Sequence, residues 1–341
     1  MPFTRLVDCG MDHADARELL CSTAAGRDWG DTAKRIGVDR LAAAQRAVAD
    51  GRAESARQLA VYAAAAFNFA QMASNQDTPE KVETYLRHVD SVRLSADLSD
   101  GLLEELSVAY GPSQLTGWLA LPSAGPPVGT VVLWGGLSGW GASYLNTARA
   151  YTRRGLACIM AEGPGQGQPR LLHGIHARPD TVNGFSRFLD VAEQDPRLNS
   201  RIGLQGNSFG GLFAAHIAST DPRVAAVVVN GAPARPTVPE FRSAREQIFA
   251  LLGTEDIELA SALLDQFRFE PAQQPIAVPC LILQGGADKL AGPRAQAPFA
   301  EAARHPESAT LTWPDGEHTL YNHAAERDSL VGDWFTDLLT R

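Results

Sequence analysis

The sequence predicts an α/β protein, with a mostly parallel sheet carrying helices on both faces, preceded by an all-helical N-terminal domain. Over residues 1–100, apolar residues recur at helical spacing and glycines are few. After Gly101, short apolar strands alternate with helical stretches, as in a βαβ array. These strands lack the polar and apolar alternation of half-exposed strands, so we expect the sheet to be covered on both faces.

The helical region, residues 1–100, is expected to act as a lid or substrate domain. Its helical periodicity covers residues 12–25, 32–50, 53–73 and 79–94. Thr78 and Pro79 favour a helix start, because a capping residue precedes a proline at the first helical position. The segment 56–74 is apolar nearly all round, so it should be buried on more than one side. Its aromatic residues, including Tyr62 and Phe67, either pack helix against helix or line a substrate cavity.

Residues 101–341 are expected to form the second domain. A pair of strands flanks Gly111-Pro112, and a continuous buried strand follows in "GTVVLWGG". Further strands follow in "LACIMAEG", "RIGLQGNS", "VAAVVVNG", "PCLILQGG" and "ATLTWPDG". Helices separate them, and "RDSLVGDWFTDLLT" closes the chain as an amphipathic helix. Residues 232–275 interrupt this rhythm with helical stretches, and we interpret them as a short cap inserted over the site.

The composition excludes several classes of partner. The chain has 341 residues, of which 45% are hydrophobic and 20% charged, as in ordinary soluble proteins. Its net charge of −9 leaves no basic surplus for nucleic acid or for an anionic membrane. It has no apolar run of about 18 residues and no basic-then-apolar leader. Four widely spaced cysteines fit free thiols in a reducing cytoplasm, where we expect the protein. The apolar helical domain makes a homodimer plausible.

The string "GLQGNSFGGL" contains G-x-S-x-G, with Gly206 and Gly210 flanking Ser208. In this motif a sharp turn from strand to helix exposes the serine oxygen, and small neighbours make room for the turn. The pattern alone is weak evidence, because glycine-rich turns are common. Support has to come from the rest of the chain.

Two later strand ends provide that support. Asp288 follows "CLILQGGA" and His318 follows "ATLTWPDGE", at the edge where chemistry occurs in parallel sheets. A serine needs an imidazole to take its proton, and the imidazole needs a carboxylate to orient it. The chain order serine, acid, histidine is that of α/β-hydrolases. The sequence therefore predicts Ser208, Asp288 and His318 as a catalytic triad.

Other interpretations of these residues remain open. Asp288 could be a turn-forming residue in "GGADKL". Asp315 and Glu317 are rival acids, although they lie in the loop of the histidine itself. His323 competes with His318, but it falls inside or beside the closing helix.

An oxyanion hole is expected from two backbone N–H groups. One should belong to Phe209, the residue after the nucleophile. The other should come from the loop "WGGLSGWG", with Leu137 as the first candidate and Gly136 as the second. That loop could alternatively be rich in glycine for packing reasons.

No cofactor or metal is expected. "GPGQGQ" at 163–168 superficially suggests a phosphate loop, but it lacks both the Gly-Lys-Ser/Thr ending and the G-x-G-x-x-G spacing. The eight histidines show no H-E-x-x-H or comparable ligand spacing.

Taken together, "VVLWGGLSG", "AEGPGQGQ", "GNSFGG", "LILQGGADK" and "DGEH…N" behind a helical domain resemble the 2,6-dihydroxypseudooxynicotine hydrolase group of α/β-hydrolases. The chain also resembles the polyketide-shortening hydrolases of pigment pathways. It departs from the D-G-P-G-Q-G-E of that group at Glu162 and Gln168. The resemblance implies cofactor-independent hydrolysis of a C–C bond beside a ketone, in an aromatic or polyketide-like small molecule. It also implies a pocket with Tyr62, Phe67 and Trp140 as candidate substrate contacts.

The same machinery serves other chemistry. A carboxylesterase or thioesterase would use the same triad, and a biosynthetic cyclase or transferase could use the fold without hydrolysis. A non-catalytic binding protein is the third alternative, and the three intact catalytic residue types argue against it.

Overall fold

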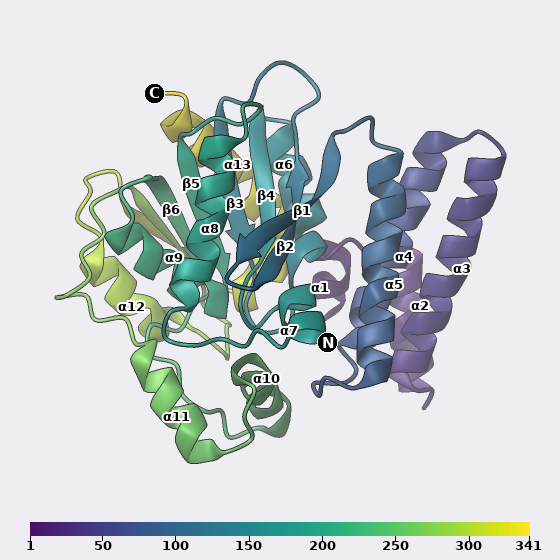
Figure 1. Ribbon diagram of the computed structural model, residues 1–341. Coiled ribbons are helices and arrows are strands. Elements are labelled where there is room, and N and C mark those ends of the chain that lie inside the picture. Colours follow the sequence, from purple (N-terminus) through teal and green to yellow (C-terminus); the bar gives the residue numbers. More distant parts are fainter. The chain divides into compact units, whose positions relative to one another are not determined.

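The structure is a computed structural model that describes residues 1–341 and divides into two compact units (Figure 1). The first unit comprises Met1–Glu105 and Ala142–Asn146, and the second comprises Leu106–Gly141 and Thr147–Arg341. The first unit therefore includes a short segment that lies far along the chain from its helices.

Five helices build the first unit, and three of them begin at a residue whose side chain caps the helix. Asp12, Asp28 and Thr78 accept hydrogen bonds from N–H groups of the following turn, the usual satisfaction of unpaired donors at a helix start. As the sequence predicts, a helix begins at Pro79. The helices are α1 (Phe3–Asp8), α2 (His13–Ala24), α3 (Trp29–Ala49), α4 (Ala53–Gln71) and α5 (Pro79–Asp97).

Helix α4 is buried around its whole circumference over residues 63–71. Its apolar sequence on all faces predicts such burial. Phe67 is fully buried, and a Cβ added at Gly37 of α3 would lie 2.8 Å from the Phe67 ring. The ring of Phe67 thus fills the space left by a glycine in the neighbouring helix.

The second unit is built on an eight-stranded sheet, in the order β1-β2-β4-β3-β5-β6-β7-β8. β2 is antiparallel to β4. In the order of the sheet, the six strands β4, β3, β5, β6, β7 and β8 are all parallel to one another. Strands β3, β4, β5 and β7 are buried along their whole length, which explains why they lack the polar and apolar alternation of half-exposed strands. The strands are β1 (Leu103–Tyr110), β2 (Ser113–Ala120), β3 (Gly129–Trp134), β4 (Leu156–Glu162), β5 (Ile202–Asn207), β6 (Val224–Asn230), β7 (Cys280–Gly285) and β8 (Ala309–Trp313).

Helices cover both faces of this sheet, so the predicted α/β architecture is confirmed (Figure 1). On one face Phe185 of α8 stacks on Phe213 of α9, with ring centroids 5.6 Å apart. On the other, Tyr151 of α6 meets Phe335 of α13 edge to face. The remaining elements are η1 (Gly141–Tyr144), α6 (Leu145–Thr152), α7 (Gly167–His173), α8 (Thr181–Gln194), α9 (Phe209–Thr220), α12 (Pro293–Ala302), η2 (His318–His323) and α13 (Ala324–Leu339).

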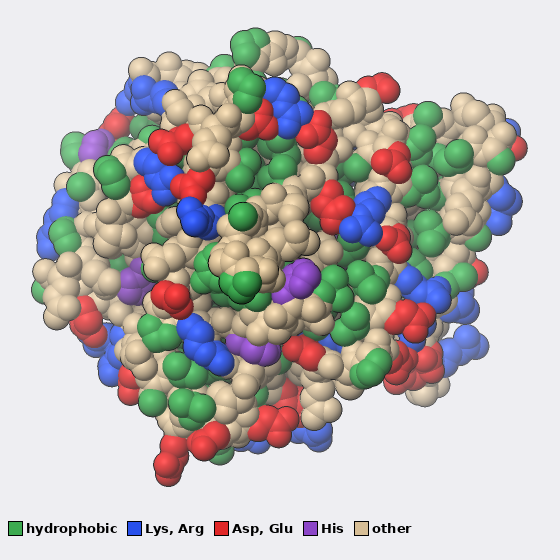
Figure 2. Space-filling view, in the orientation of Figure 1, with side chains coloured by type: hydrophobic (Ala, Val, Ile, Leu, Met, Phe, Trp, Pro, Cys, Tyr) green, Lys and Arg blue, Asp and Glu red, His purple; other side chains and the backbone are tan.

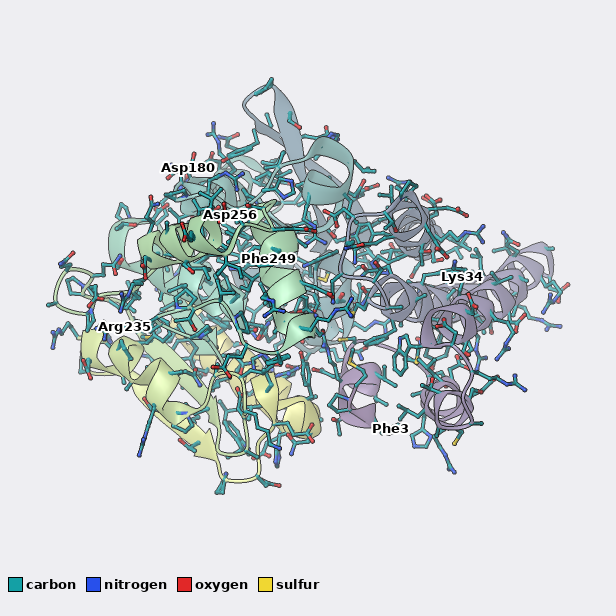
Figure 3. All side chains as sticks on the ribbon, turned by 90° about the horizontal axis from the view of Figure 1, so that it is seen from below. Phe3, Lys34, Asp180, Arg235, Phe249 and Asp256 are labelled. Atoms are coloured by element: carbon teal, nitrogen blue, oxygen red, sulfur yellow. The ribbon has the colours of Figure 1, made fainter.

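The segment 232–275, expected as an insertion, contains α10 (Arg242–Leu252) and α11 (Ile257–Gln266). Figure 3 shows Phe249 on α10 and Asp256 at the start of α11. At the base of the segment, the Phe269 N–H donates to the Ala234 carbonyl over 2.9 Å. Phe267 then packs edge to face on Phe213 of α9. The two ends of the segment are therefore hydrogen-bonded to each other and packed on α9, and α10 and α11 lie between these ends in the chain.

The surface in Figure 2 shows acidic and basic side chains interspersed, without a broad patch of one sign. None of the helices has both the length and the apolar character that crossing a bilayer requires. The four cysteines are free thiols, and burial raises the pKa of Cys280 to about 12.

Candidate active site

Ser208 occupies the turn between β5 and α9, with φ 54° and ψ −133°. A residue other than glycine is strained at these φ and ψ values. A Cβ at Gly206 would lie 2.3 Å from the Gly210 carbonyl oxygen, and one at Gly210 would lie 2.3 Å from the carbonyl oxygen of Gly135. The flanking glycines are therefore sterically required, as the motif implies.

The structure brings Ser208, His318 and Asp288 into one hydrogen-bonded chain. The Ser208 Oγ lies 2.8 Å from His318 Nε2, and His318 Nδ1 lies 2.9 Å from Asp288 Oδ2. Because a carboxylate only accepts, the Nδ1 atom carries the proton and Nε2 is left to accept from the serine. This is the tautomer that a general base requires.

Asp288 is fixed by more than the histidine. Its Oδ1 accepts the N–H groups of Leu290 and Ala291 over 2.7 and 3.0 Å. Burial alone would raise the pKa of this carboxyl, but His318 and the two N–H groups outweigh it, so the pKa of Asp288 lies below its usual range. Asp288 thus forms a turn and also holds the imidazole.

The rival residues pair elsewhere. His323 Nε2 lies 3.0 Å from Asp315 Oδ1, and the side chain of Asp315 is 76% exposed. The Glu317 N–H donates to Asn322 Oδ1 in the same loop. The carboxylate that accepts from His318 Nδ1, in the series of hydrogen bonds leading to Ser208, belongs to Asp288 and to neither rival acid.

The loop after β3 comes close to the nucleophile. A Cβ added at Gly136 would lie 2.8 Å from the Phe209 nitrogen and 3.1 Å from the Ser208 Oγ. The Phe209 N–H belongs to the first turn of α9, where N–H groups have no acceptor inside the helix. Both segments expected to form the oxyanion hole therefore border Ser208.

Gln166, which the sequence did not single out, orients that loop. Its Nε2 donates to the carbonyls of Gly135 and Gly136 over 2.7 and 3.1 Å, and its side chain is buried. In a trans peptide the C=O and N–H point in opposite directions. The N–H of Leu137 therefore points away from Gln166.

Glu162, at the end of β4, is also buried. Its Oε2 accepts from Thr116 Oγ1 over 2.9 Å and from the Gln168 N–H over 3.0 Å. A Cβ at Gly141 would lie 2.4 Å from Oε1, and one at Gly167 would lie 2.0 Å from Oε2. The two positions that depart from the expected motif thus contact each other, and glycines enclose the carboxylate.

The three residues expected to contact the substrate, Trp140, Tyr62 and Phe67, have different surroundings. Trp140 is buried, and the Arg170 guanidinium lies over its ring, 4.6 Å from the centroid. In the first unit, Arg40 lies over the Tyr62 ring at 5.7 Å, and Phe67 packs on Gly37. Contact of these three residues with a substrate stays a prediction.

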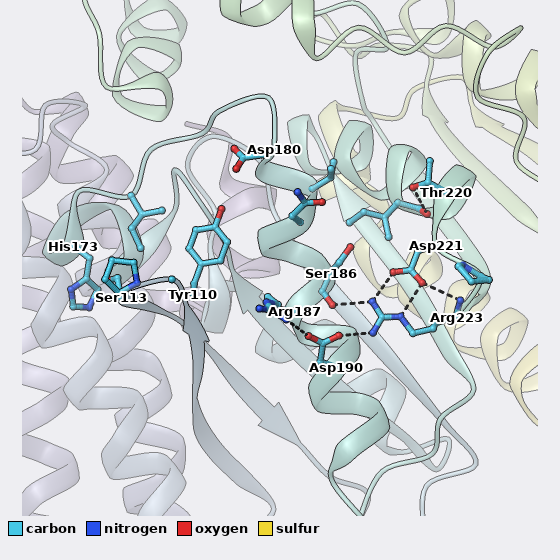
Figure 4. A pocket seen from close by; sticks show the side chains of 17 residues that line it. Tyr110, Ser113, His173, Asp180, Ser186, Arg187, Asp190, Thr220, Asp221 and Arg223 are labelled. Atoms are coloured by element: carbon cyan, nitrogen blue, oxygen red, sulfur yellow. Dashed lines mark hydrogen bonds and ion pairs between the residues drawn. The ribbon is translucent and has the colours of Figure 1, made fainter.

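A surface groove of about 930 Å³ lies along the β1–β2 turn, α8 and the end of α9 (Figure 4). Its lining contains none of Ser208, Asp288 and His318. There Arg223 contacts Asp221 and Asp190 over 2.7 and 2.6 Å. This groove is therefore not the site built by the hydrogen-bonded chain.

Comparisons with known proteins find similarity to several hydrolases. A model of the Dienelactone hydrolase family matches residues 151–281. The protein named 2,6-dihydropseudooxynicotine hydrolase from Paenarthrobacter nicotinovorans is 26% identical over 54% of this chain and 50% of its own. Alpha/beta hydrolase ucsC from Acremonium sp. is 28% identical over 44% of this chain and 34% of its own. The matches span about half or less of these relatives.

Among solved structures, that of 2,6-dihydroxy-pseudo-oxynicotine hydrolase aligns over 99% of this chain and 96% of its own, with a TM-score of 0.87 and 21% identity. A structure of AbyA5 aligns over 91% of this chain and 88% of its own, with a TM-score of 0.68. The chain therefore has an α/β-hydrolase fold with a helical region before it, and the resemblance drawn from its motifs is confirmed.

Proposed function

We propose that the protein is a cofactor-independent serine hydrolase that cleaves a C–C bond next to a ketone, in an aromatic or polyketide-like small molecule. The observation that carries the proposal is the hydrogen-bonded chain from Asp288 through His318 to Ser208. Its tautomer is the one required to make a serine nucleophilic, and its chain order is that of α/β-hydrolases.

In the first half-reaction, Ser208 Oγ attacks the ketone carbon and His318 Nε2 takes its proton. The oxyanion rests on N–H groups of Phe209 and Leu137, with Gly136 as the second candidate for the loop. The C–C bond then breaks, and its electron pair stays on the departing carbon as an enolate or phenolate-like anion. His318 returns the proton to that carbon, which leaves an acyl group on Ser208.

In the second half-reaction, His318 deprotonates a water molecule, which attacks the acyl carbon. The bond to Ser208 breaks, the serine regains its proton, and a carboxylic acid leaves. The sum is one ketone plus one water giving one acid plus one C–H product. A variant route, in which His318 activates water directly, has the same stoichiometry.

Cleavage of a C–C bond, rather than an ester, is supported by the likeness to 2,6-dihydroxy-pseudo-oxynicotine hydrolase over 99% of the chain, including its helical first unit. A carboxylesterase is the second candidate. Structures described as esterases, among them the esterase domain of a Rhodothermus marinus protein, align over 70% of this chain, in that case with a TM-score of 0.51.

Product analysis by mass spectrometry tests the proposal. The protein would be incubated in H₂¹⁸O with aryl ketones, β-diketones and matched esters, with Ser208→Ala as the control. We expect ketone substrates to give an acid that carries ¹⁸O, together with a C–H product. Cleavage of the esters alone would establish the second candidate, and products without added water would indicate a cyclase or transferase.

A further inference from the structure

A buried asparagine joins the nucleophile strand to the histidine loop. Asn230, the last residue of β6, is fully buried, and its Nδ2 donates to Asn207 Oδ1 over 2.8 Å and to the Thr319 carbonyl over 3.1 Å. A carbonyl oxygen only accepts, so the atom of Asn230 that faces Thr319 is the amide nitrogen. Asn207 directly precedes Ser208, and Thr319 directly follows His318.

The backbone of Asn230 makes a further link. Its carbonyl accepts the N–H of Ser208 over 2.8 Å. One residue therefore contacts the nucleophile, the side chain before the nucleophile, and the residue after the general base.

The histidine loop needs such a restraint, because its backbone is strained. Thr319 and Leu320 have φ values of 53° and 62°, which residues other than glycine rarely adopt. Strained conformations persist only where the surroundings hold them. A Cβ at Gly231, directly after Asn230, would lie 3.1 Å from the Thr319 nitrogen, so β6 and the loop are in close contact.

A second donor holds the same carbonyl. Arg327 of α13 donates through Nη1 to the Thr319 oxygen over 2.9 Å, and its Nε donates to Asp328 Oδ1 over 2.8 Å. Thr147 Oγ1 donates to the other oxygen of Asp328 over 3.0 Å. All of these side chains are buried, so solvent does not compete for the bonds.

We infer that Asn230, assisted by Arg327, is a positioning residue that holds His318 against Ser208 by clamping the Thr319 carbonyl. The inference rests on the proposed function, because it assigns His318 the role of general base. Asn230 itself is fully buried, so it acts through the loop of His318. Its effect is to keep Nε2 within hydrogen-bond reach of Oγ, and displacements of about 1 Å can cost about a hundredfold in rate.

The test is the rate at which a fluorophosphonate probe inactivates wild-type protein, Asn230→Ala and Thr130→Val, with kinact and KI measured separately. Thr130→Val is the matched control. It removes the two hydrogen bonds of Thr130 Oγ1, which donates to the Asn199 carbonyl over 2.7 Å and accepts the Asn199 N–H over 3.2 Å at the opposite end of the sheet. Rates are divided by the folded fraction from circular dichroism. Ser208→Ala reports labelling elsewhere on the protein.

We expect Asn230→Ala to lower kinact about 10- to 100-fold and to leave KI within about twofold, and Thr130→Val to change neither. Arg327→Lys, which keeps a donor, should retain more of kinact than Arg327→Met does. Equal kinact for Asn230→Ala and the wild type would overturn the positioning role while the proposed function stands. A wild-type protein that does not label would overturn the proposed function, and the positioning role with it.

Discussion

Four residues other than glycine have a positive φ, and three of them belong to the candidate site: Ser208, Thr319 and Leu320. Such conformations cost on the order of 1–3 kcal/mol each, so their concentration at one place is informative. The half-buried Ser208 lies at a strained turn, and the loop of His318 contains the two other strained residues. Local backbone preferences are broken where the side chains must meet.

At the scale of the residue, replacing Asp288 tests the orientation of the imidazole. Asp288→Asn can donate to Nδ1, which favours the tautomer in which Nε2 carries the proton and cannot accept from Ser208. We expect kcat to fall roughly 10³- to 10⁴-fold with a small change in KM. Steady-state kinetics on the best substrate of the product screen would measure this.

Asp315→Asn is the matched control for that prediction, because Asp315 is an exposed acid paired with His323. We expect its kinetics to remain within about twofold of the wild type. A large loss in Asp315→Asn, with little loss in Asp288→Asn, would identify the rival pair as the catalytic one.

At the scale of the element, Gln166 offers a test of the loop after β3. Gln166→Ala leaves the carbonyls of Gly135 and Gly136 without their donor, so the Leu137 N–H is no longer aimed. Loss of one oxyanion donor costs about 10²- to 10³-fold in kcat. We expect a loss near the lower end of that range, because the N–H group remains present and only its orientation is released.

Asn199→Ala is the control for Gln166. The Asn199 amide also donates to two backbone carbonyls, those of Pro127 and Val128, but at the amino end of β3. Both variants should lose some thermal stability, and Gln166→Ala alone should lose activity per folded molecule. Equal activity in the two variants would show that Gln166 has only a structural role.

The elements differ in how far the sequence could predict them. Buried strands and the closing helix follow from unbroken apolar runs and from periodicity, and Pro79 marks its helix start. The helix after the nucleophile starts at Phe209, because the turn at Ser208 leads directly into it. The role of Gln166 could not be predicted, because its partners lie 30 residues or more away and are backbone atoms that leave no pattern in the sequence.

At the scale of the molecule, the candidate triad was predictable because parallel strands end at one edge, so residues 208, 288 and 318 are brought together by topology alone. The role of Phe67 was not predictable, because an apolar helix face has the same periodicity whether it packs on a neighbouring helix or lines a cavity. In the structure Phe67 packs on Gly37, and its contact with a substrate stays a prediction. The bond that is cleaved depends on the pocket and is likewise not written in the motifs.

The buried His88 should make the free energy of unfolding of the protein decrease at acidic pH. Burial lowers the pKa of His88 to about 4, partly offset by the hydrogen bond to the Ala64 carbonyl. The unfolded chain, with an ordinary histidine pKa near 6.5, takes up the proton first. The contribution of His88 to stability is therefore complete above about pH 6.5, falls as the pH drops to 4, and amounts to about 3 kcal/mol.

Urea unfolding at pH 7 and pH 5 would measure this dependence. His88→Phe should be slightly less stable at pH 7, because the bond to Ala64 is lost, and should lose less stability between the two pH values than the wild type. His13→Gln, at an exposed position of α2, serves as the control and should behave as the wild type. An unchanged pH dependence in His88→Phe would contradict the prediction.

The enclosure of Glu162 has a consequence for what the glycine-rich loop at 163–168 can bind. A loop of this composition would ordinarily offer its N–H groups to a phosphate. Here the Gln168 N–H donates to the carboxylate of Glu162, and Gly141 and Gly167 leave no room beside it. A side chain of the protein itself occupies the place where a nucleotide would bring its phosphate. Inorganic phosphate and nucleotides should therefore be poor inhibitors, since each would have to displace the buried side chain of Glu162.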